Sequence, residues 1–72
     1  MNAQHSSTAI ASLCQSVRAQ GLSATEEIAR QWLKDGLISG YTLILGKERE
    51  IAVLEVRFPD GKTFKADRQE MN

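Results

Sequence analysis

The sequence has few of the residues that staple small proteins or carry out chemistry. Among its 72 residues there is one cysteine, one histidine, one proline and one tryptophan. A single cysteine cannot form a disulfide within the chain, and one cysteine with one histidine cannot supply the ligands of a zinc site built on them. His5 stands in a polar segment with no second ligand nearby, and Cys14 falls on an apolar helical stripe, where we expect a buried and unreactive thiol. We therefore expect no catalytic residue, no metal and no cofactor.

An excess of charge of one sign is also missing. Nine Lys and Arg residues balance nine Asp and Glu residues, so the formal net charge is zero. The two signs alternate closely in both halves of the chain. Nucleic-acid binding draws most of its affinity from clustered Lys and Arg that contact phosphates. The charge pattern therefore disfavours a nucleic-acid partner.

Long hydrophobic runs are absent as well. No run approaches the ~18 apolar residues of a spanning helix, and the N-terminal segment has no basic region of the kind that begins a signal peptide. A lone thiol fits a reducing compartment better than an oxidising one. These features predict a cytoplasmic protein that does not bind a membrane.

What remains is the composition of a small globular domain. Hydrophobic residues make up 42% of the chain, which is too many for a disordered protein. A chain of this length buries roughly 60% of the surface that its unfolded form exposes, so its core is marginal. We expect one domain over residues 1–72, with flexible ends at 1–6 and 68–72.

Two helices are predicted in the first half of the chain. Apolar residues at the spacing i, i+3, i+4 and i+7 predict a first helix that ends at Gly21. The segment Ser23-Ala24-Thr25-Glu26 matches a capping box and predicts that Ser23 begins a second helix, which ends before Gly36. We expect Ser23→Ala to cost about 1 kcal/mol of stability. The predicted buried stripes are Ile10, Leu13, Cys14 and Val17 in the first helix, and Ile28, Ala29, Trp32 and Leu33 in the second.

After Gly36 the apolar period changes to two, which predicts three strands at residues 41–45, 51–58 and 62–66. The turn Pro59-Asp60-Gly61 predicts a three-residue hairpin loop with a positive φ at Gly61. That loop opposes Val56 to Phe64 and places the apolar side chains on one face. The predicted core face consists of Ala52, Leu54, Val56, Phe58, Phe64 and Ala66. The predicted fold is α+β: two N-terminal helices on one face of a three-stranded antiparallel sheet, in the order ααβββ.

The pairing of the first two strands has two solutions. A five-residue turn over residues 46–50 opposes Leu45 to Ile51 and puts Leu43 and Val53 on the outer face. A four-residue turn instead places Tyr41 and Leu43 in the core. Either solution leaves large aliphatic side chains on the face that the helices do not cover, which predicts a protein interface or a homodimer. The candidate interface residues are Leu43, Ile44, Ile51 and Val53.

The sequence thus favours a non-enzymatic protein-interaction module, such as an adaptor, a subunit or a regulator. The alternative is a nucleic-acid-binding protein, because the order helix–helix–strand–hairpin resembles part of the winged-helix architecture. Its candidate contact residues are Arg57, Lys62 and Lys65 around the hairpin. Glu26 and Glu27 in the first turn of the would-be recognition helix argue against it, because they would repel phosphates.

Overall fold

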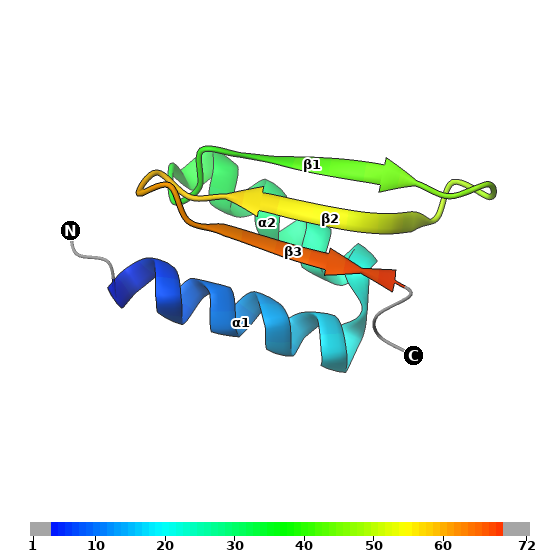
Figure 1. The fold of residues 1–72 in the computed structure, drawn as a ribbon, viewed down its shortest axis with the longest axis horizontal. Helices are drawn as coiled ribbons and strands as arrows, with labels where there is room; N and C mark the ends of the chain where they lie inside the picture. The colour runs from blue at the N-terminus through cyan, green and yellow to red at the C-terminus, as the bar shows by residue number, and fades with distance from the viewer. Residues whose placement is uncertain (1–3, 69–72) are drawn as a thin grey trace.

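The computed structural model describes residues 4–68 as two helices followed by three strands (Figure 1). The predicted α+β fold with the order ααβββ is confirmed. The predicted flexible ends, 1–6 and 68–72, include residues 1–3 and 69–72, which lie outside the described residues. Residues 4–6, expected to be frayed, form the first turn of a helix. The elements are α1 (Gln4–Gln20), α2 (Leu22–Asp35), β1 (Gly40–Leu45), β2 (Ile51–Arg57) and β3 (Thr63–Asp67).

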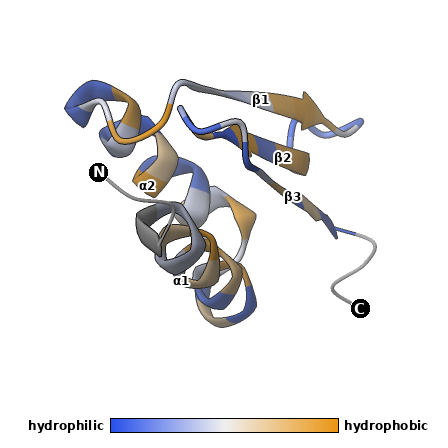
Figure 2. Cartoon of the chain, turned by 60° about the vertical axis from the view of Figure 1, so that its left-hand side comes forward, coloured by the Kyte–Doolittle hydropathy of each residue, from blue (hydrophilic) through white to orange (hydrophobic). Residues whose placement is uncertain are grey.

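The molecule has two layers, with both helices on one face of the antiparallel sheet (Figure 2). The strand order is β1-β2-β3, so β2 is central and the other two strands are the edges. Helix α2 packs on β2, and α1 packs on β3. The opposite face of the sheet, here called the outer face, is covered by no other element of residues 4–68 (Figures 1 and 2). The core between the layers consists of Leu13, Val17, Leu22, Ala29, Ile38, Leu54, Val56, Phe58, Phe64 and Ala66.

A single residue, Gly21, joins the two helices. Its φ of 95° and ψ of 175° belong to a region that only glycine adopts without strain. The Gly21 N–H donates to the carbonyls of Ser16 (3.2 Å) and Val17 (3.0 Å), and its own carbonyl accepts from the N–H of Thr25 (3.3 Å). Gly21 therefore ends α1 and begins α2 without an intervening loop.

The prediction that Ser23 caps the second helix is wrong. Helix α2 begins at Leu22, its N-cap is Gly21, and no side chain makes a capping hydrogen bond. Ser23 is exposed in the first turn, and Glu26 does not reach back to it. The Glu26 carboxylate instead accepts hydrogen bonds from Arg30 (3.0 Å) and from the Tyr41 hydroxyl (2.9 Å). The stability loss expected for Ser23→Ala therefore has no structural basis.

The predicted burial of Cys14 is also wrong, because Cys14 is exposed. The buried positions of α1 include two serines, Ser6 and Ser16, beside Leu13 and Val17. The Ser16 hydroxyl lies 2.7 Å from the Thr25 hydroxyl in a buried hydrogen bond between the helices. Hydropathy periodicity does not count serine as a core residue. The buried side of the helix was therefore predicted to include Cys14, whereas it includes Ser16. In α2 the predicted stripe is displaced in the same way: Leu33 is 43% exposed, whereas Thr25 is fully buried.

The predicted pairing of β2 with β3 is confirmed. Val56 pairs with Phe64, and Leu54 pairs with Ala66. The Phe58 N–H donates to the Lys62 carbonyl at 2.8 Å, which closes a three-residue loop. Gly61 has a φ of 93°, as the loop requires.

The pairing of β1 with β2 follows neither predicted solution throughout, because Leu43 does not pair with Val53 and Leu45 does not pair with Glu50. Leu45 pairs with Ile51, as the five-residue turn requires, but the register then shifts so that Leu43 pairs with Leu54. Ala52 is the unpaired residue of this bulge, and it is half-buried instead of a full member of the core. Tyr41 and Leu43 consequently pack against the core, as the four-residue turn requires.

Candidate interaction surface

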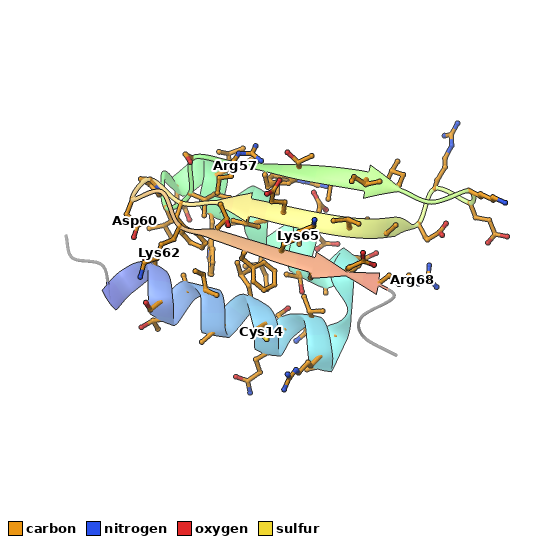
Figure 3. All side chains as sticks on the ribbon, viewed as in Figure 1. Cys14, Arg57, Asp60, Lys62, Lys65 and Arg68 are labelled. Atoms are coloured by element: carbon orange, nitrogen blue, oxygen red, sulfur yellow. The ribbon has the colours of Figure 1, made fainter. Side chains whose placement is uncertain are left out.

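The β3 side of the sheet is covered and held by several contacts. Helix α1 packs beside β3, and the loop between β2 and β3 lies over the first turn of α1 (Figure 3). The Ser6 hydroxyl donates a hydrogen bond to the Asp60 carboxylate, and Lys62 Nζ donates to the Ser7 hydroxyl at 3.3 Å. The Ser6 hydroxyl, followed by the Lys62 N–H, lowers the pKa of Asp60 below its ordinary value. These contacts between residues 6–7 and 60–62 are here called the latch.

The β1 side of the sheet ends in an uncovered strand. Within residues 4–68, no element lies beyond β1 in either view of the molecule (Figures 1 and 2). The strand Gly40–Leu45 carries no charged residue and no proline. Natural proteins usually block such an edge with charges, proline, a bulge in the edge strand or a covering element, because its free N–H and C=O groups pair readily with another strand. This strand is here called the β1 edge.

The large exposed hydrophobic side chains of the described residues fall in one stretch of the chain, in β1 and shortly before it. All four that are exposed among the described residues fall within residues 33–45. Two lie near the start of β1, in the last turn of α2 and in the α2–β1 connection, and two lie at the end of β1, whose hydrophobic character is visible in Figure 2. Grouped exposure of this kind typically marks an interaction site. The four are Leu33 (43% exposed), Leu37 (55%), Ile44 (55%) and Leu45 (53%).

The contacts that β1 makes with α2 and β2 do not involve the main-chain groups on its outer edge. Tyr41 links the strand to α2 through the buried Glu26 carboxylate. On the outer face, Arg57 of β2 lies across Gly40, where an added Cβ would stand 3.1 Å from its guanidinium. The Arg57 guanidinium also donates to the Thr42 hydroxyl at 2.8 Å. Strand β1 is therefore held by α2 on the helix side and by β2 along one edge. The main-chain groups on its other edge contact no element of residues 4–68.

The four interface residues predicted from the sequence divide between the two faces of the sheet. Ile44 and Val53 are paired on the outer face, while Leu43 and Ile51 pack against the core. Sequence reasoning missed Leu33, Leu37 and Leu45. The signal that could have found this surface is the absence of any charged residue between positions 36 and 46.

The three basic residues considered for nucleic-acid contact do not form one patch. Arg57 and Lys65 lie on the outer face together with the acidic residue Glu55. Glu55 pairs with Lys65 across the two strands, and its carboxylate lies 3.7 Å from the Arg57 guanidinium. Lys62 lies in the loop region and takes part in the latch (Figure 3). A strip of alternating signs of this kind gives weak attraction for phosphates.

An open recess of about 370 Å³ lies between α1 and β3, with Cys14, Arg18 and Lys65 among its lining residues.

Over residues 4–68, no group of three or more His, Cys, Asp or Glu side chains is placed to hold a metal ion. None of the described helices combines the length and hydrophobicity needed to cross a membrane. No family model, curated protein or solved structure matches the chain. A functional proposal therefore depends on the chemistry of the surface itself.

Proposed function

We propose that the protein is a non-enzymatic protein-interaction module of the cytoplasm that binds its partner at the β1 edge. One observation carries this proposal: every exposed large hydrophobic side chain of the described residues lies in β1 or shortly before it, and β1 is an uncharged edge strand that pairs only with β2. An adaptor, a subunit or a regulator needs such a surface and no catalytic group. The partner would supply an extended segment that adds a strand to the sheet.

The chemistry of the β1 edge suits strand addition. Its free main-chain N–H and C=O groups would provide affinity that does not depend on the partner's sequence. Neighbouring side chains point to opposite faces of a strand, so Ile44 contacts the partner on the outer face and Leu45 on the helix side. Leu37 extends the apolar contact beyond the start of the strand.

Charge disfavours the nucleic-acid alternative. The basic side chains Arg57 and Lys65 are interrupted by Glu55, and the net charge of the whole chain is zero. A protein that neutralises several phosphates shows binding that weakens steeply as salt rises. A salt titration with random duplex DNA would reveal such binding, and we expect none.

The protein proposal is tested by proximity labelling in the cells that make the protein. The variant Ile44→Lys/Leu45→Lys adds two charges to the β1 edge, and both side chains are more than half exposed, so the fold should persist. The control Gln15→Lys/Gln20→Lys adds the same charges to exposed positions of α1. We expect specific partners to be labelled by the wild type and the control and lost in the edge variant. Labelling that is equal for all three proteins, or salt-sensitive DNA binding, would contradict the proposal.

A further inference from the structure

We infer that the β1 edge pairs with the β1 edge of a second copy of this chain, in an antiparallel arrangement that makes one six-stranded sheet. This inference rests on the proposed function and specifies its partner. Strand-to-strand pairing about a two-fold axis perpendicular to the sheet keeps the helices of both copies on the same side. It also satisfies the free main-chain groups of both edges at once.

Two registers pair the greatest length of the two strands. The two-fold axis of an antiparallel pair can pass between two copies of any one residue, and an axis at Thr42 or at Leu43 pairs five residues of Gly40–Leu45. With the axis at Leu43, Tyr41 faces Leu45 of the second copy and Thr42 faces Ile44. With the axis at Thr42, Leu45 lies beyond the paired strand. The register centred on Leu43 therefore covers the more apolar surface, and we assign it to the dimer.

The two ends of the β1 edge complement each other. Leu33 and Leu37 lie near the start of the strand, and Ile44 and Leu45 lie at its end. An antiparallel pair brings the start of one strand to the end of the other. Leu45 of one copy, on the helix side, is thus brought toward the end of the second copy that carries Leu33 and Leu37, and the contact occurs twice, whereas Ile44 lies on the outer face. A partner of different sequence would have to reproduce both groups in the same order.

The charge closest to β1 is Arg57, whose guanidinium lies across Gly40 and binds Thr42, and charges of opposite sign lie near the two ends of the strand. Helix α2 ends at Asp35, close to the start of β1, and Lys47 follows the end of the strand. Antiparallel pairing brings Lys47 of the second copy toward the end of the sheet that carries Asp35. The paired strands themselves hold no charge, so like charges do not meet at the centre of the interface.

The size of the contact sets the expected affinity. Five paired residues span roughly 17 Å along a sheet about 10 Å thick. Stable interfaces bury about 800 Å² on each partner, and a strand pair of this size with a few flanking leucines falls short of that area. A dissociation constant in the micromolar range follows, so the dimer should form and dissociate within an accessible range of concentration.

Sedimentation equilibrium of the purified protein between about 1 and 100 µM tests this inference, because that range brackets a micromolar constant. A reductant is required, since Cys14 is exposed and could form adventitious disulfides. We expect a monomer–dimer equilibrium in the wild type and in Gln15→Lys/Gln20→Lys. In Ile44→Lys/Leu45→Lys the interface gains four like charges, which would face Thr42 and Tyr41 of the opposite copy, and this should raise the dissociation constant at least about 10-fold. Circular dichroism confirms that each variant is folded.

Two results would overturn the inference. One is a species of 8.0 kDa at every concentration. The other is a dimer that the edge variant leaves intact, which would place the contact elsewhere. If the protein is monomeric but the edge variant still loses its labelled partners in cells, the proposed function stands and only the second copy is wrong. If neither assay responds to the edge variant, both proposals fail.

A disulfide test fixes the register. In a Cys14→Ser background, Thr42→Cys/Ile44→Cys places two pairs of thiols opposite each other on the outer face when the axis lies at Leu43. Mild oxidation should then give a covalent dimer, whereas Thr42→Cys alone and Thr63→Cys on the opposite edge strand should remain mostly monomeric. Efficient cross-linking of Thr42→Cys alone would show that the axis lies at Thr42.

Discussion

The two edges of the sheet are treated in opposite ways. The β3 edge has α1 packed beside it, carries Lys65 and Asp67, and is held by the latch between Ser6 and Asp60. The β1 edge has no covering element among the described residues and no charge, and large aliphatic side chains stand exposed at both of its ends. One sheet thus contains both the usual protection against strand pairing and its absence.

The difference teaches that exposure of the β1 edge is not simply a result of small size. The same chain supplies a helix and two charges to protect β3. Twelve of the 18 charged residues lie within residues 37–72, yet none falls within β1. A contrast within one sheet is a better guide to an interaction site than exposed hydrophobic residues considered alone.

The largest expected effect concerns the cores beneath the two edges. Phe64→Ala on β3 removes a side chain that is 7% exposed and should cost about 3–5 kcal/mol, close to the whole stability of a domain of this size. Leu43→Ala on β1 removes a half-buried side chain and should cost less than about 2 kcal/mol. Denaturant unfolding at low protein concentration measures both as monomers. Equal losses would show that the two sides are packed alike.

A smaller effect is expected in the two hairpin turns, which differ in how they accommodate a positive φ. The β2–β3 turn uses Gly61 (φ 93°), while the β1–β2 turn uses Arg49 (φ 67°). Gly61→Ala should destabilise the protein by roughly 1–2 kcal/mol, because an L side chain is strained there. Arg49→Gly should stabilise it by roughly 0.5 kcal/mol, since the relief of strain exceeds the entropy that glycine loses. Thermal unfolding should show shifts of opposite sign, and a lower melting temperature for Arg49→Gly would contradict the second.

The smallest effect concerns the latch. Because the hydrogen bond from Ser6 lowers the pKa of Asp60 below its ordinary value in the folded protein, the ionised carboxylate favours the folded state. This contribution is fully present above the unfolded pKa and is lost as the pH falls through the lower folded pKa. Asp60→Asn should therefore lower the melting temperature slightly at neutral pH and should flatten its decline in acid. A variant whose acid dependence matches the wild type would show that the latch is not formed in solution.

The sequence predicted the β2–β3 pairing because two independent requirements agree there. The turn chemistry of Pro59 and Gly61 fixes the loop length, and side-chain alternation fixes the faces. For β1 and β2 these requirements conflict: the turn demands that Leu45 oppose Ile51, while burial demands that Leu43 face the core. The bulge at Ala52 resolves the conflict. No local signal distinguishes a bulge at alanine from a regular strand.

The errors in the helices have a common cause, which is polar burial. Ser16 and Thr25 occupy the helix junction because they bond to each other, and Glu26 is buried because Arg30 and Tyr41 satisfy it. The capping motif at Ser23 is a pattern of neighbouring residues. The Glu26 carboxylate instead accepts a hydrogen bond from Tyr41 of β1, which is 15 residues away in the sequence. The candidate surface was predicted only in part for the same reason, since Leu33 looks like a core residue until the serine and threonine positions are known.

The packing of α1 on β3 has a consequence for synthesis of the chain. The helix leaves the ribosome first, but the strand that covers it, Thr63–Asp67, is made more than forty residues later. Until then α1 and α2 can form only a helical pair with an unsatisfied apolar face. Folding of the described domain is therefore completed only after β3 has been translated.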